Sequence, residues 1–113
     1  MLSRKVLAIA SLSTIVSTQA GLAEEPFKSS KFQTYPVDSQ KSYIATSVLM
    51  AVAIAGDNNP EQNRCLKRWL TENDGIGFPT VKAAMDRFPE HHPTGVIVAV
   101  LEKECGSFKY VAK

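Results

Sequence analysis

Two cysteines, Cys65 and Cys105, constrain the fold of this chain more than any other feature of the sequence. In a small exported chain, two cysteines most simply form one disulfide. The alternatives are a nucleophilic cysteine and a metal-binding pair, and the lack of a CxxC spacing disfavours the second. Closing a loop of about 40 residues stabilises a fold by roughly 4 kcal/mol in the chain-entropy model. We therefore expect a disulfide that links the two ends of the 65–105 stretch.

Residues 1–23 have the pattern of a cleaved signal peptide. A basic start (MLSRK) precedes an apolar run over residues 6–16, and small residues at Ala20 and at Ala23 offer two cleavage positions. The alternative is an N-terminal membrane anchor, but the run is shorter than the about 20 residues that span a bilayer. The sequence thus predicts a periplasmic protein with no stable membrane anchor, and the choice between the two cleavage positions stays open.

The charge of the chain argues against nucleic acid as a partner. The full sequence has 13 Lys and Arg against 11 Asp and Glu. Loss of Arg4 and Lys5 with the signal peptide lowers the basic count from 13 to 11, so the mature chain is formally neutral. A neutral chain has no general electrostatic attraction for a phosphate backbone. We expect a protein partner instead, and a homodimer is also left open.

The mature chain divides into a tether and one domain. Residues 24–38 mix Pro, Ser, Lys and Gln without any period, which predicts a flexible tether. Within it, Phe32, Tyr35 and Val37 are able to lie on the core in extended form. Residues 39–113 predict a small all-α domain of four helices, stapled by the disulfide.

The first predicted helix begins near Asp38 or Ser39, as the capping residue, and ends at about Ala55, with Gly56 in the left-handed position. Two apolar stripes run along it: Ile44, Val48, Ala51, Val52 and Ala55 form one, and Tyr43, Ser47, Met50 and Ile54 form the other. Such a helix is either buried on most sides, which we favour, or offers one face to a partner.

The second predicted helix begins with Asn59 as its cap and Pro60 at its first position, and Gln62 completes a capping box. Its apolar face carries Cys65, Leu66, Trp69 and Leu70, and its other face carries Arg64, Lys67 and Arg68. Such a basic cluster is more often a solvated face than a docking patch.

Residues 71–79 predict a polar, turn-rich loop between two helices. A simple connection is the default interpretation. If the protein has a binding protrusion, this loop is the first candidate. The candidate partner-binding residues are Asn73, Asp74, Gly75, Ile76, Gly77 and Phe78.

Two further helices follow. The 80–88 segment has Val81, Ala84, Met85 and Phe88 at helical spacing and stops at Pro89. The apolar run 96–101 is ambiguous between strand and helix, because β-branched residues favour a strand. We favour a helix, since a lone strand would lack a partner for its backbone groups. Its inward-facing residues would be Ile97, Leu101 and Cys105.

We expect no catalytic residue, no cofactor and no metal site. The cysteines are used by the disulfide, and the adjacent His91 and His92 point in different directions without a third histidine. A calcium loop starting at Asp57 is rejected, because Gln62 and Arg68 stand where glycine and glutamate are required.

From Cys65 to Cys105 the chain resembles the small periplasmic immunity proteins of the Tai type, which protect bacteria from peptidoglycan amidases delivered by type VI secretion. The resemblance is carried by Pro89, Glu90, His92 and Pro93, followed by an apolar helix and the closing Cys105. It implies a non-catalytic protein that blocks the active site of a cell-wall amidase with a surface loop, here by analogy the 71–79 loop. The alternatives are an envelope-associated structural protein and a periplasmic stress chaperone.

Overall fold

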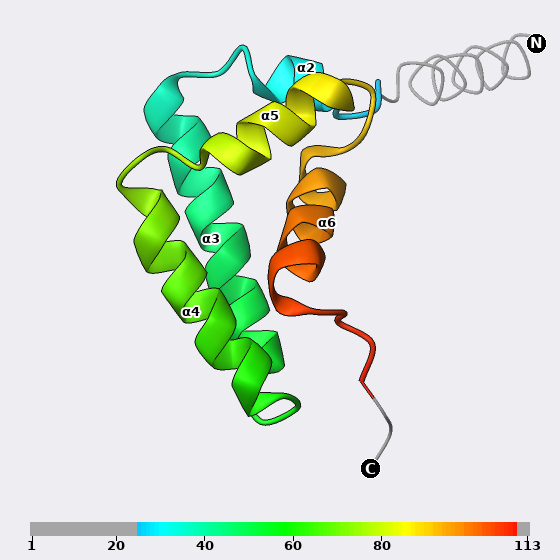
Figure 1. The fold of residues 1–113 in the computed structure, drawn as a ribbon. Helices are drawn as coiled ribbons and strands as arrows, with labels where there is room; N and C mark the ends of the chain where they lie inside the picture. Colours follow the sequence, from blue (N-terminus) through cyan, green and yellow to red (C-terminus); the bar gives the residue numbers. More distant parts are fainter. Residues whose placement is uncertain (1–24, 111–113) are drawn as a thin grey trace, which may run out of the picture.

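The structure is a computed structural model that describes residues 25–110. The predicted signal peptide and its cleavage positions lie outside the described residues. Five helices make up the described part, which contains no strand: α2 (Ser29–Phe32), α3 (Val37–Ala55), α4 (Pro60–Asp74), α5 (Pro79–Arg87) and α6 (Pro93–Cys105). In Figure 1, α3 and α4 lie side by side, and α2 and α5 lie together at one end of this pair. The all-α prediction is confirmed, with α2 in addition to the four expected helices.

The disulfide is confirmed and joins α4 to α6. The Cα atoms of Cys65 and Cys105 are 5.6 Å apart. The ambiguous 96–101 run lies inside α6 and is therefore helical. Ile97 and Leu101 face the core as expected, and Cys105 is partly buried against it.

One core joins all five helices. The largest buried apolar side chains are Phe32 from α2, Ile44 and Val48 from α3, Leu66 from α4, Phe78, Val81 and Met85 at and within α5, and Ile97 and Leu101 from α6. Burying one such side chain stabilises a fold by about 1.5–3 kcal/mol. The first predicted stripe of α3 lies in this core except for Val52, which is only partly buried, while Phe88 of the 80–88 pattern is exposed.

The helix starts were predicted with mixed success. The Asn59 cap is confirmed, since its Oδ1 accepts a hydrogen bond of 3.0 Å from the backbone N–H of Gln62. The capping box is not formed, because the Gln62 side chain turns toward the C-terminal segment instead. The predicted cap of the first helix is wrong: Pro36 precedes α3 without any side-chain cap.

Gly56 does not adopt the left-handed conformation that the sequence predicted. Its φ is 3°. The requirement for glycine is spatial, because a Cβ at this position would lie 2.9 Å from the carbonyl oxygen of Ala53. The tight turn after α3 therefore excludes a side chain by contact rather than by a positive φ.

The predicted tether is wrong for most of its length. Residues 29–32 form α2, and Phe32 reaches the core from a helical turn rather than from an extended segment. Tyr35 and Val37, which the sequence allowed to lie on the core in extended form, are exposed. The aromatic ring of Phe32 and the backbone hydrogen bonds of Ser29 and Ser30 fix this segment on the domain.

Candidate functional site: the groove between α3 and α6

An open apolar groove of about 1060 Å³ lies between α3 and α6 and is the principal candidate site. Its apolar lining comes from Tyr43, Met50, Ala51 and Ile54 of α3, from Ile97, Val98 and Leu101 of α6, and from Phe108 after α6. Met50 is 62% exposed and Ile54 is 55% exposed. Large side chains of this kind cost free energy in water, so a contiguous exposed set marks a candidate binding surface.

The groove exists because α3 is apolar on two sides. The core takes the stripe that contains Ile44 and Val48, while Met50 and Ile54 of the second stripe face the groove. The favoured interpretation, a helix buried on most sides, is therefore wrong. The structure agrees with the alternative of a helix that keeps one face open.

The polar part of the lining is almost uncharged. Hydroxyl groups come from Ser39, Ser42, Thr46, Ser47 and Thr94, and Asp38 supplies a carboxylate. The Ser47 hydroxyl already donates to the carbonyl oxygen of Tyr43 at 2.8 Å. Since a charge buried without a partner is costly, such a lining favours an apolar, uncharged occupant over an ionic one.

A hydrogen bond ties the two walls together at one point. The hydroxyl groups of Tyr43 on α3 and Thr94 on α6 lie 2.6 Å apart, and either group is able to donate. Thr94 stands in the first turn of α6, where its backbone N–H donates to Nδ1 of His92 at 3.1 Å. The start of α6 is therefore fixed against α3 independently of the disulfide at its other end.

Phe108 reaches the groove on a C-terminal segment that α4 holds in place. The buried Gln62 side chain donates from Nε2 to the carbonyl oxygens of Gly106 and Ser107 at 2.8 and 3.0 Å. Its Oε1 accepts a hydrogen bond of 2.7 Å from the Tyr110 hydroxyl, and burial raises the pKa of that hydroxyl. On the α6 side, the backbone N–H of Phe108 donates to Oε2 of Glu102 at 3.1 Å. We call residues 106–110 the clamped tail.

The predicted binding loop is shorter than expected and only part of it is exposed. Asn73 and Asp74 belong to the last turn of α4, and the loop itself is 75–78. Phe78 is 0% exposed and packs on Trp69 with 5.8 Å between ring centroids. Its predicted role as a partner contact is therefore wrong, and Phe78 anchors the loop instead. Ile76 is 68% exposed and remains the apolar candidate in this loop.

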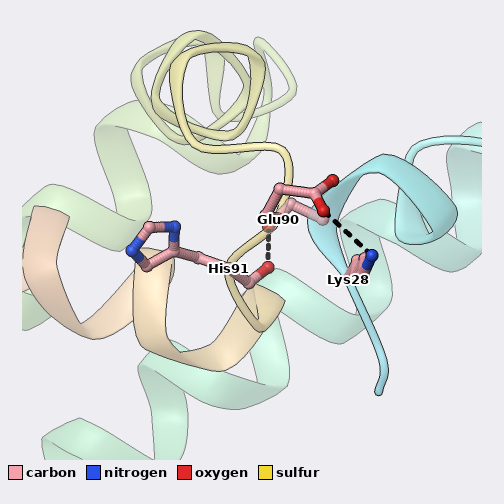
Figure 2. A network of polar contacts seen from close by, with 4 residues as sticks. Lys28, Glu90 and His91 are labelled. Carbon is pink, nitrogen blue, oxygen red and sulfur yellow. Dashed lines mark hydrogen bonds and ion pairs between the residues drawn. The ribbon is translucent and has the colours of Figure 1, made fainter. Parts of the chain in front are cut away.

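The turn between α5 and α6, which carries the family resemblance, receives the chain's own N-terminal segment. The carbonyl oxygen of His91 accepts from both the backbone N–H and the hydroxyl of Ser29, at 2.8 and 2.7 Å. Figure 2 shows the accompanying ion pair, in which Lys28 Nζ lies 2.9 Å from Glu90 Oε1. This hydrogen bond raises the pKa of Lys28, but an exposed pair of this kind adds little stability.

The ring of Phe27 completes that contact. It lies edge-on to the His92 ring, with 5.3 Å between centroids, and also meets Tyr43 at the edge of the groove. Three of the motif residues, Pro89, Glu90 and His92, thus have a structural role in this chain. They hold residues 27–30 against the domain.

Within residues 25–110, no group of three or more His, Cys, Asp or Glu side chains is placed to hold a metal ion. None of the helices in this range is both long enough and apolar enough to cross a membrane. Comparisons with protein-family models, with curated proteins and with solved structures found no match to this chain. Fold and site together define the protein as an all-α, disulfide-linked domain with an open, nearly uncharged groove.

Sequence reasoning missed the contributions of Gln62, Val98 and Thr94 to this site. Gln62 was assigned to a helix cap, and its spacing of three residues from Cys65 was the signal that both face the end of α6. Val98 and Thr94 were hidden in a segment whose secondary structure was ambiguous. Phe108 packs against the edge of the core and forms one wall of the groove.

Proposed function

We propose that this protein is a non-catalytic binding protein of the periplasm, of the immunity type, which blocks a peptidoglycan amidase. The observation that carries the proposal is the open α3–α6 groove, which the folded domain presents without any rearrangement. The resemblance of the stretch from Cys65 to Cys105 to the Tai-type immunity proteins supports an amidase as the partner.

An apolar segment of the partner would bury the exposed side chains of the groove. Met50, Ile54 and Val98 offer the apolar contact area, and burial contributes about 25 cal/mol per Å² of apolar surface. The hydroxyl groups along α3 are able to form hydrogen bonds at the rim. Ile76, on the short loop before α5, is a second and separate contact that the family analogy favours.

Affinity capture tests the proposal. Oxidised protein comprising residues 24–113 is immobilised and exposed to a periplasmic extract, and the bound material is identified by mass spectrometry. We expect one stoichiometric peptidoglycan-cleaving enzyme, whose activity falls as this protein is added. Recovery of no partner, or an enzyme that stays fully active in the complex, contradicts the proposal.

The same groove also supports the second candidate, a periplasmic stress chaperone, because exposed apolar side chains bind unfolded chains. A chaperone of this kind would expose more apolar surface in acid, whereas a rigid inhibitor would not. Binding of a hydrophobic dye between neutral and acidic pH separates them. A strong rise in dye fluorescence at low pH, together with capture of many unrelated proteins after acid treatment, supports the chaperone.

A further inference from the structure

The two ends of the groove between α3 and α6 are held by different contacts. At one end, Tyr43 and Thr94 connect the walls directly. Phe108 belongs to the clamped tail, and its backbone N–H donates to Glu102 in the last turn of α6. The tail is also hydrogen-bonded to Gln62 of α4, a helix that does not line the groove. The position of Phe108 therefore depends on how the last turn of α6 sits against α4.

We propose that the Cys65–Cys105 disulfide acts as a redox gate on the groove. When the disulfide is formed, the clamped tail packs on α4 and Phe108 completes its wall of the groove. Reduction releases the tail while the rest of the domain stays folded. The biological meaning of this gate rests on the proposed function, but the gate itself is a property of the isolated protein.

The geometry couples the disulfide to the tail. Gln62 and Cys65 are three residues apart on α4, so their side chains lie one above the other on one face. Cys65 holds Cys105, and Gln62 holds the two residues that follow it, Gly106 and Ser107. Gly106 and Ser107 are exposed residues, so water is able to replace Gln62 at their carbonyl groups once the covalent link is lost.

The rest of α6 has attachments of its own. Val96, Ile97 and Leu101 are buried in the core. The start of the helix is held by the hydrogen bond between Thr94 and Tyr43. Release should therefore be confined to the last turn of α6 and the clamped tail, and the remaining helices should keep their packing.

The chemistry requires a thiol reductant. A dithiol attacks one sulfur of the disulfide and then closes on itself, so that the reductant is oxidised to a cyclic disulfide and Cys65 and Cys105 each gain one proton as thiols. Reducing compartments maintain this thiol state, and an oxidising compartment reverses it. The groove would thus be complete only where the protein is oxidised, which keeps it from binding before export.

Hydrogen–deuterium exchange read by mass spectrometry tests the gate without any partner. Protein comprising residues 24–113 is compared oxidised and after treatment with dithiothreitol. We expect deuterium uptake in peptides covering 103–110 to rise about twofold or more at short times, because local opening exposes their amides. Peptides from α3 and from residues 93–101 should be unchanged. Equal uptake in 103–110, or a rise in all helices together, overturns the proposal.

A second variant tests the role of Gln62 in the gate with the disulfide intact. Oxidised Gln62→Leu should show the same rise in uptake over 103–110, while the neighbouring exposed substitution Glu61→Gln should not. If Gln62→Leu leaves the uptake of the oxidised tail unchanged, Gln62 does not link the disulfide to the groove and the gate as proposed is wrong. Because no partner is used, this outcome is independent of whether an amidase is bound.

Discussion

Gln62 and Tyr110 form a hydrogen bond of 2.7 Å across 48 positions of the sequence. The same glutamine side chain also donates to two backbone carbonyl groups of the tail. One buried amide thus uses its oxygen and its nitrogen to fix the segment that carries Phe108. Helix α4 thus helps to hold the part of the groove wall that Phe108 forms, although α4 does not line the groove.

Replacing Gln62 should destabilise the domain moderately. Gln62→Leu removes three hydrogen bonds, but the freed carbonyl groups of Gly106 and Ser107 are able to bind water. We expect a loss of about 1–2 kcal/mol in the free energy of unfolding. Urea unfolding followed by circular dichroism measures this loss. An unchanged urea midpoint would show that the hydrogen bonds of Gln62 contribute no stability.

The Tyr110 hydroxyl should give the domain an alkaline sensitivity. Burial raises its pKa in the folded state above the ordinary value of 10.0, so the folded state favours the neutral phenol. The resulting stability is fully present below the unfolded pKa and is lost as pH rises through the folded pKa. Urea midpoints measured across this alkaline range should fall more steeply for the native protein than for Tyr110→Phe. If the urea midpoints of the two proteins fall equally with pH, the raised pKa of Tyr110 is contradicted.

The start of α4 should depend on its capping residue. Asn59→Ala removes the acceptor for the Gln62 backbone N–H and should cost about 0.5–2 kcal/mol. The matched control is Asn58→Ala, because the Asn58 side chain only donates to the carbonyl oxygen of Ile54 at an exposed position. Thermal unfolding of both variants checks this. A control as destabilised as Asn59→Ala would contradict the capping role.

The two large apolar residues of the loop before α5 should behave in opposite ways. Phe78→Ala opens a cavity beside Trp69 and should destabilise the fold by about 3–5 kcal/mol. Ile76→Ala changes an exposed side chain and should leave the free energy of unfolding within about 0.5 kcal/mol of the native value. Chemical unfolding compares them directly. Similar losses at both positions would mean that the loop packs differently from the structure.

Local signals predicted most of the fold. The Asn59-Pro60 pair marks the start of α4, and the spacing of Val81, Ala84 and Met85 marks α5. These signals act within a single helical turn, so they can be recognised without the tertiary structure. The pairing of Cys65 with Cys105 was also predictable without the tertiary structure, because the sequence contains only these two cysteines.

Long-range partners decided what the sequence did not reveal. Phe32 forms part of a helical turn because its ring meets the core and the Ser29 backbone meets the carbonyl oxygen of His91, 62 positions away. Phe78 and Ile76 are both large apolar residues beside Gly77, and only the tertiary structure shows that Phe78 packs in the core against Trp69 while Ile76 is exposed. The groove likewise depends on which stripe of α3 the core covers, and both stripes are largely apolar.

A groove-directed substitution in the capture experiment tests the central claim most directly. Met50→Lys places a charge in the groove. The matched Leu49→Lys places a charge on a similarly exposed residue of α3 that does not line the groove. We predict that the captured amidase is lost with Met50→Lys and retained with Leu49→Lys, with both variants folded by circular dichroism. Capture that survives Met50→Lys undiminished would contradict the account and direct attention to Ile76 on the loop.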